Sequence, residues 1–113
     1  MPKGNDSTVE DFVEAIEYVI GVCGEDHVGI GTDFSQGHAR PGPFMDFANR
    51  DKGYARLLTQ FGHSKVLKPK GIERIAEMPN VTATMLKRGW AEPLICKVLG
   101  GNWLNVLDAV WTV

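Results

Sequence analysis

The stretch at residues 27–34, His-Val-Gly-Ile-Gly-Thr-Asp-Phe, constrains the fold of this chain more than any other. Its β-branched residues are typical of a short buried strand, whereas Gly29 and Gly31 leave one face bare, as happens where a backbone approaches a neighbour or a ligand closely. Asp33 follows where such a strand would end. Binding and catalytic groups collect at the C-terminal ends of strands in α/β proteins, so Asp33 is a candidate functional carboxylate.

A single buried strand also poses an energetic problem. Its backbone groups would be unpaired along both edges, and each buried, unpaired group costs on the order of 1–3 kcal/mol. No other stretch of this chain is predicted as a strand. We therefore expect the pairing partners to come from self-association, from a partner polypeptide or from the missing part of a longer protein.

Composition narrows the class of protein. With 113 residues and 43% hydrophobic residues, the chain is predicted to be one globular unit with a single core. A net charge of -2 and the lack of a basic stripe argue against a nucleic-acid partner. The sequence shows neither a membrane-length apolar run nor the pattern of a secretion signal, so we expect a cytoplasmic protein with no membrane partner. Cys23 and Cys96 fall in apolar helical patterns and are predicted to be buried, inert thiols.

Helical patterns flank the predicted strand. Ser7 and Glu10 fit a capping box, apolar residues then recur at three- and four-residue spacing, and Gly24 supplies a helix end. We predict a single unit over residues 1–113, with a helix at about 8–23, a strand at about 27–33, a long loop at about 35–70 and short helices at about 71–111. A long loop after a strand-end carboxylate is typical of a segment that covers substrate, although a surface excursion explains it almost as well.

The C-terminal part is predicted as a series of short helices. Thr82 is the expected N-cap of residues 83–88, and Glu92 with its following proline begins the next helix. The glycine pair at 100–101 would end that helix, and Asn102 would cap the last one. The apolar residues of the last helix are expected to face other helices, and the three tryptophans to fill the space between helices (Trp90, Trp103 and Trp111).

Three motifs in order carry a family resemblance. They are the Gly-Ile-Gly-Thr-Asp-Phe segment at 29–34, the Leu-Lys-Arg-Gly-Trp turn at 86–90 and the Leu-Gly-Gly-Asn-Trp step at 99–103. Over nearly the whole chain, from about Ser7 to Trp111, the sequence resembles the C-terminal portion of the membrane dipeptidase (renal dipeptidase) family of zinc metallopeptidases. The resemblance implies an α/β fold. This chain would be the C-terminal fragment of an amidohydrolase-type (β/α)8 TIM barrel, its last strand plus closing helices, and helix-rich when isolated.

The resemblance also implies a zinc-dependent dipeptidase with a binuclear zinc centre. In that family the metals are held by a His-x-Asp pair, a bridging Glu and two later His residues, and no matching segment occurs here. We therefore expect no metal bound to this chain alone and no activity without the missing N-terminal barrel portion. A trio of His27, Asp33 and His38 would not substitute, because six residues of strand separate its first two members by about 20 Å.

By resemblance, Asp33 is the catalytic residue that accepts a proton from the attacking water and passes it to the leaving amine. The residues after it depart from the family pattern, so the candidates for the substrate loop are Phe34, Ser35, Gly37 and His38. The substrate would be a dipeptide or a related amide. Two alternatives stay open: Asp33 only caps a turn, or the chain is a non-catalytic helical packing or partner-binding module derived from a dipeptidase.

Overall fold

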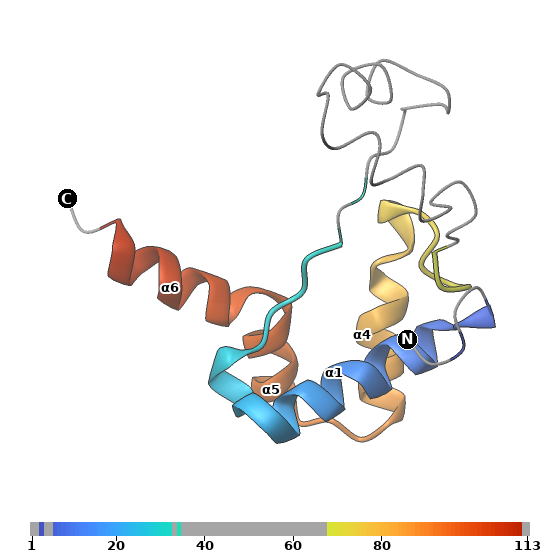
Figure 1. Ribbon diagram of the computed structural model, residues 1–113, viewed down its shortest axis with the longest axis horizontal. Coiled ribbons are helices and arrows are strands. Elements are labelled where there is room, and N and C mark those ends of the chain that lie inside the picture. Colours follow the sequence, from blue (N-terminus) through green and yellow to red (C-terminus); the bar gives the residue numbers. More distant parts are fainter. Residues whose placement is uncertain (1–2, 4–5, 33, 35–67, 112–113) are drawn as a thin grey trace, which may run out of the picture.

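The structure is a computed structural model that describes residues 3, 6–32, 34 and 68–111. Helix α1 (Val9–Cys23) is followed by the 3₁₀ turn η2 (Glu25–His27). In the second described stretch, residues 68–111, the 3₁₀ turn η4 (Ile75–Glu77) leads into α4 (Pro79–Lys87). The chain then forms α5 (Glu92–Cys96), the π-helical turn η5 (Lys97–Gly101) and α6 (Asn102–Val110). In Figure 1, α1, α4 and α5 form a body from which α6 projects.

The first predicted helix is present, but its cap lies one residue further along than expected. The Thr8 side chain accepts from the backbone N–H of Asp11, and the Asp11 carboxylate accepts from the Thr8 N–H at 2.9 Å. The backbone of Ser7 is instead paired, because Lys70 N–H donates to its carbonyl at 2.9 Å. A parallel bridge between Thr8 and Lys70 thus fixes the chain just before α1 and moves the helix start from the predicted Ser7–Glu10 box.

The predicted strand at about 27–33 is wrong for the part that the structure describes. His27 closes the turn η2, and residues 28–32 form an irregular connection, although Val28 itself is extended with φ -118° and ψ 128°. A strand exists only where neighbouring backbones exchange hydrogen bonds, and within residues 6–32 and 68–111 the one β-type pairing is the Thr8–Lys70 bridge. The helix-rich part of the fold prediction is confirmed, and no sheet forms among these residues.

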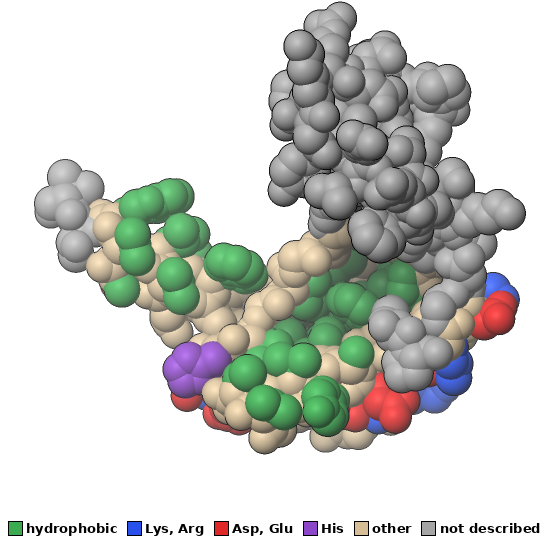
Figure 2. Space-filling view, in the orientation of Figure 1, with side chains coloured by type: hydrophobic (Ala, Val, Ile, Leu, Met, Phe, Trp, Pro, Cys, Tyr) green, Lys and Arg blue, Asp and Glu red, His purple; other side chains and the backbone are tan. Residues whose placement is uncertain are grey.

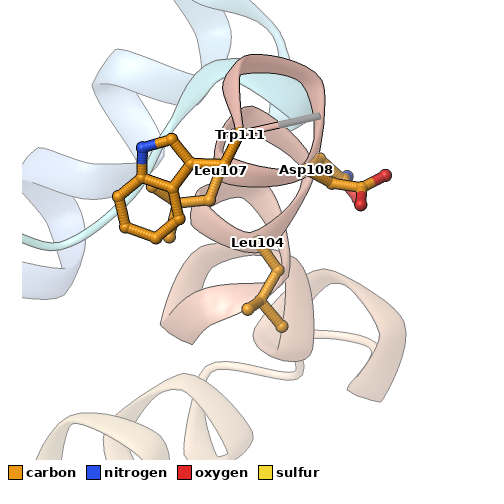
Figure 3. A pocket seen from close by; sticks show the side chains of 5 residues that line it. Leu104, Leu107, Asp108 and Trp111 are labelled. Carbon is orange, nitrogen blue, oxygen red and sulfur yellow. The ribbon is translucent and has the colours of Figure 1, made fainter. Parts of the chain in front are cut away.

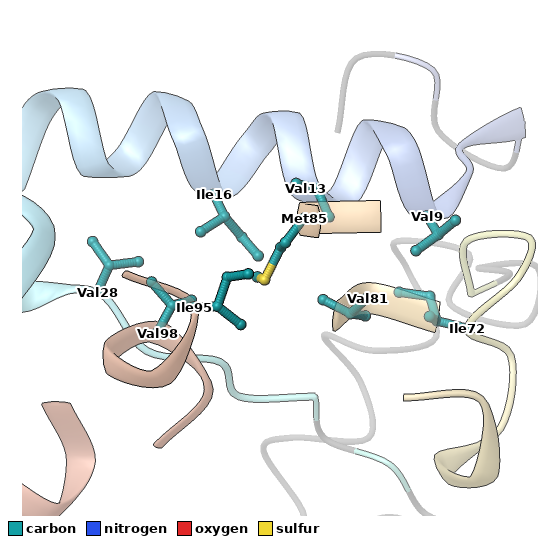
Figure 4. Packing of buried hydrophobic residues seen from close by; sticks show 9 residues of the cluster. All are labelled: Val9, Val13, Ile16, Val28, Ile72, Val81, Met85, Ile95 and Val98. Atoms are coloured by element: carbon teal, nitrogen blue, oxygen red, sulfur yellow. The ribbon is translucent and has the colours of Figure 1, made fainter. Parts of the chain in front are cut away.

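The core lies between α1, α4 and the α5–η5 segment (Figure 4). Val13, Met85 and Val98 have no solvent-exposed surface. They are joined by six further buried apolar side chains: Val9, Ile16, Val28, Ile72, Val81 and Ile95. Val28 therefore anchors the irregular connection to the core by its side chain. The two cysteines are both exposed and free, which contradicts the prediction of buried thiols.

Two helix boundaries differ from those predicted. Helix α4 begins at Pro79 with Thr82 inside it, because proline suits a first helical turn. The glycine pair at 100–101 does not end a helix, since η5 continues without a break into α6. Asn102 therefore has helical φ and ψ (-65° and -37°), and its side chain is free to bond elsewhere. The predicted helix beginning at Glu92 is present as α5.

Helix α6 exposes most of its apolar side chains, and Figure 2 shows them along the projecting arm. Trp103 is 50% exposed and Trp111 is 70% exposed, so neither is the core residue that was predicted, whereas Trp90 is half-buried. Leu104, Val106 and Val110 are exposed as well. The predicted apolar face of the last helix is present on α6, but no element within the described ranges packs against it. In those ranges no helix combines the length and apolarity needed to cross a membrane.

Candidate functional site

The approach to Asp33 is described on both sides, but Asp33 itself lies outside the described residues. The same holds for three of the four substrate-loop candidates (Ser35, Gly37 and His38). Phe34 is described and half-buried, and the ammonium of Lys68 lies 4.2 Å from the centroid of its ring. This distance is typical of a cation–π contact. Phe34 and Lys68, which flank residues 35–67 in the sequence, thus contact each other, and the catalytic role of Asp33 remains a prediction.

The backbone that leads to Asp33 is held by two side chains at the start of α6. Asn102 Nδ2 lies 2.8 Å from the Val28 carbonyl oxygen and 2.7 Å from that of Glu25. The indole Nε1 of Trp103 donates to the Ile30 carbonyl at 3.3 Å. Hydrogen bonds from side chains therefore satisfy carbonyls that a neighbouring strand would satisfy in a sheet.

Gly29 is the close-approach position that the sequence predicts. A Cβ at this residue would lie 2.5 Å from Trp103 Nε1, closer than two such atoms can stand. A Cβ at Gly31 would meet nothing within 4 Å. The prediction of a bare face is thus confirmed at Gly29, where the neighbour is the Trp103 indole, while Gly31 faces open space among the described residues.

An ion-pair cluster fixes the start of the same segment. The ammonium of Lys97, in η5, lies 2.5 Å from a Glu25 carboxylate oxygen and 2.7 Å from one of Asp26. The hydrogen bond from Lys97 holds the pKa of Asp26 below its ordinary value, and the two carboxylates raise the pKa of Lys97. The turn η2 is therefore tied to η5 immediately before residues 28–32 begin.

The Arg-Gly-Trp turn has a structural role in the described part of the chain. Arg88 Nε donates to Glu17 Oε1 at 2.8 Å while its Nη2 pairs with Glu17 Oε2, and Trp90 Nε1 donates to Glu17 Oε1 at 2.7 Å. The hydrogen bond from Arg88 is the main cause that lowers the pKa of Glu17. One carboxylate thereby joins α1 to the turn after α4.

A shallow hollow lies on α6. It is lined by five residues of that helix and its end: Leu104, Asn105, Leu107, Asp108 and Trp111. Figure 3 shows Leu107 and Trp111 on one side of the helix and the Asp108 carboxylate on the other. One acid and one amide among three apolar side chains supply neither a nucleophile with its base nor a metal ligand set, so this hollow is not the site of chemistry.

Comparison with known proteins decides the family. The family model described as "Membrane dipeptidase (Peptidase family M19)" matches residues 2–68 and 57–113, which together span all but the first residue. This chain belongs to the membrane dipeptidase family. The resemblance carried by the three sequence motifs is therefore confirmed.

The relatives of this M19 chain are much longer than it is. A crystal structure of an amidohydrolase from Pseudomonas aeruginosa is 53% identical with a TM-score of 0.81, and the match covers 96% of this chain but 32% of that one. Dipeptidase tcpJ of Claviceps purpurea (strain 20.1) is 28% identical over 104 residues, which is 92% of this chain and 18% of the relative. A Klebsiella pneumoniae protein called "Uncharacterized protein in pqqA 5'region" is 25% identical over 109 residues, 96% of this chain and 30% of its own length.

The family depends on metal, and the described residues of this M19 chain do not fit a metal centre. Nowhere in residues 6–32 and 68–111 do three or more His, Cys, Asp or Glu side chains gather closely enough to bind an ion. The ring of His27 is used locally, with Nδ1 3.0 Å from the Cys23 carbonyl oxygen. Any metal ligands would have to come from other polypeptide or from residues outside the described ranges.

Two residues that hold the candidate site were missed by the sequence reasoning. Asn102 was predicted to be a helix cap and Lys97 was not singled out, yet both contact the Glu25–Val28 region from about 70 residues away in the chain. Local patterns contain no signal for such long-range contacts. The Leu-Gly-Gly-Asn-Trp motif was the available pointer, because it joins Asn102 to Trp103 in one conspicuous step.

Proposed function

We propose that this chain is a segment of a metal-dependent dipeptidase and that it supplies Asp33 to the active site. The single observation that supports this most is the family match, which runs through residues 2–113 and so includes both the Asp33 segment and the helices that hold it. The segment would be the last strand and closing helices of a (β/α)8 barrel. A cytoplasmic location and a dipeptide or related amide as substrate belong to the same proposal.

The proposed role of Asp33 follows from the needs of amide hydrolysis. A water molecule must lose a proton as it attacks the carbonyl carbon, and the amine must gain a proton as it leaves. One ionised carboxylate placed between them serves both steps in turn. Asp33 is supported in this role by its place in the Gly-Ile-Gly-Thr-Asp-Phe motif, next to a backbone that α6 holds at three carbonyls.

Completion by further polypeptide is part of the proposal. The chain spans about a third of the Pseudomonas amidohydrolase, and the described residues build no metal centre. The metal ligands would therefore be supplied by the remaining two thirds of a family member. The exposed apolar residues of α6 also support this, because side chains such as Leu104 and Val110 gain free energy when a neighbouring segment covers them.

A chimera tests the proposal. The matching third of the Pseudomonas aeruginosa amidohydrolase is replaced by this chain, and the chimera, the parent and the isolated chain are assayed on one panel of dipeptides. We expect turnover by the chimera that a chelator abolishes, and neither turnover nor stoichiometric zinc for the isolated chain.

Two results would contradict the proposal. A folded, metal-loaded chimera without activity on any dipeptide of the panel would favour the second candidate, a packing module that keeps the family sequence without its chemistry. Chelator-sensitive turnover by the isolated chain would show that completion is unnecessary.

A further inference from the structure

The side chain of Asn102 is placed as a clamp and not as a helix cap. It is 4% exposed, and its one amide nitrogen bonds the carbonyls of Glu25 and Val28, on either side of the junction between η2 and the segment 28–32. A flipped amide would set Oδ1 against both carbonyl oxygens, so the hydrogen bonds define the orientation. Oδ1 is buried with no partner among the described residues, which indicates that the amide sits here for its donors.

Trp103 holds a second carbonyl of the same segment. Its indole donates to the Ile30 carbonyl, two residues beyond the Val28 carbonyl that Asn102 bonds. The indole reaches its position because residue 29 is glycine, since a Cβ there would collide with it. Two consecutive residues of α6 thus hold the carbonyls of Val28 and Ile30.

We propose that Asn102 and Trp103 are positioning residues that set the path of residues 28–32, and through it the point at which Asp33 leaves that segment. This inference rests on the proposed function, in which Asp33 carries the proton. Asp33 follows Ile30 by three residues in the sequence. A base must lie within about 3 Å of the proton that it takes, and a misplacement of about 1 Å costs on the order of 100-fold in rate.

The contact itself is tested in the full chain by NMR. Trp103→Phe removes the indole donor and keeps a ring on a half-exposed site, so the fold is expected to survive, and Gly29→Ala displaces the same indole from the other side. We expect both variants to shift the ¹³C and amide signals of residues 28–32. Trp111→Phe is the matched control, because Trp111 is 70% exposed at the far end of α6. Unchanged signals in both test variants would overturn the proposal.

The functional part is tested in the chimera with the same three variants and Asn102→Ala, each checked for folding by circular dichroism. Trp103→Phe and Gly29→Ala are expected to lower kcat by about 10-fold or more with KM within about twofold, because substrate binding is retained while the base is misplaced. Trp111→Phe is expected to leave both constants unchanged. Shifted NMR signals with kcat unchanged within about twofold would overturn the positioning role.

The two proposals fail in different ways. If the chimera folds, binds metal and gives unperturbed NMR signals for residues 28–32 but hydrolyses no dipeptide, the proposed function is wrong. The positioning role is then wrong as well, because it depends on that function. If the chimera is active and its kcat is unchanged by Trp103→Phe, Gly29→Ala and Asn102→Ala, only the positioning role is wrong and the proposed function stands.

Discussion

The carboxylate of Glu17 offers the sharpest test of how this chain holds together. It accepts three hydrogen bonds, two from the Arg88 guanidinium and one from the Trp90 indole, and so joins α1 to the turn after α4. Glu17→Gln keeps the size of the side chain but turns one acceptor oxygen into an amide donor that faces Arg88. The variant therefore loses the charge and at least one of the three bonds.

The expected loss of stability follows from the exposure of the pair. Hydrogen bonds to charged groups contribute about 1.5–3 kcal/mol when shielded, whereas fully exposed ion pairs contribute roughly 0.2–1 kcal/mol. The side chains of Glu17 and Arg88 are 34% and 35% exposed, which places them between these limits. We expect Glu17→Gln to lower the free energy of unfolding by about 1–2 kcal/mol at neutral pH.

Urea unfolding followed by tryptophan fluorescence measures this change in the free energy of unfolding. Its dependence on pH shows whether the change comes from the Glu17 carboxylate or from a general effect of net charge. The pKa of Glu17 is lowered from its ordinary value of 4.5, so the stabilisation is complete above pH 4.5 and is lost as pH falls through the lower pKa of the folded state. The difference between wild type and variant should therefore shrink below pH 4.5. Glu14→Gln, an exposed change on the same helix, is the control. A difference below about 0.3 kcal/mol at neutral pH, or one that persists in acid, would show that the Glu17 carboxylate does not stabilise the contact between α1 and the turn after α4.

Two paired substitutions test the core and the turns. Met85→Ala removes a fully buried side chain and should lower the free energy of unfolding by about 2–5 kcal/mol in urea denaturation. Leu86→Ala, at the exposed neighbouring residue, should change it by about 0.5 kcal/mol or less. Similar losses for both variants would contradict the placement of the core. Gly89 has a φ of 81°, so Gly89→Ala should cost about 1–2 kcal/mol, while Gly100→Ala, where a Cβ meets nothing within 4 Å, should stabilise the helical run by about 0.5–1 kcal/mol. Thermal melting measures the second pair, and the reverse order would show that the backbone geometry is misassigned.

The helices were predictable where a local pattern decides them. The apolar spacing of α1 and the proline at the start of α5 are signals within a single turn, and both elements are present. The cap of α1 was missed by one residue because a contact from Lys70, 62 positions beyond Thr8, fixes the chain there. Local patterns cannot report such a contact.

The strand and the tryptophans were mispredicted for one shared reason. Residues 28–32 have strand-like composition, but a strand needs a neighbouring backbone, and none lies beside it among the described residues. Trp103 and Trp111 likewise have the character of core residues without a surface to cover them. The three motifs of the family resemblance are present here, whereas packing partners for residues 28–32 and for the tryptophans of α6 are not among the described residues. The motif around Asp33 could be read from the sequence and its role stays a prediction, whereas the hydrogen bonds from Asn102 to Glu25 and Val28 could not be predicted.

The measurement that tests the account most directly is the effect of Asp33→Asn on dipeptide hydrolysis by the completed chimera. The substitution keeps the shape of the side chain and removes its ability to accept a proton. Asp108→Asn, on the exposed face of α6, is the matched control. We predict that kcat falls by roughly 10²–10⁴-fold for Asp33→Asn and stays within about twofold for the control. A kcat for Asp33→Asn within about threefold of the unsubstituted chimera would contradict the claim that this chain carries the proton acceptor of the reaction.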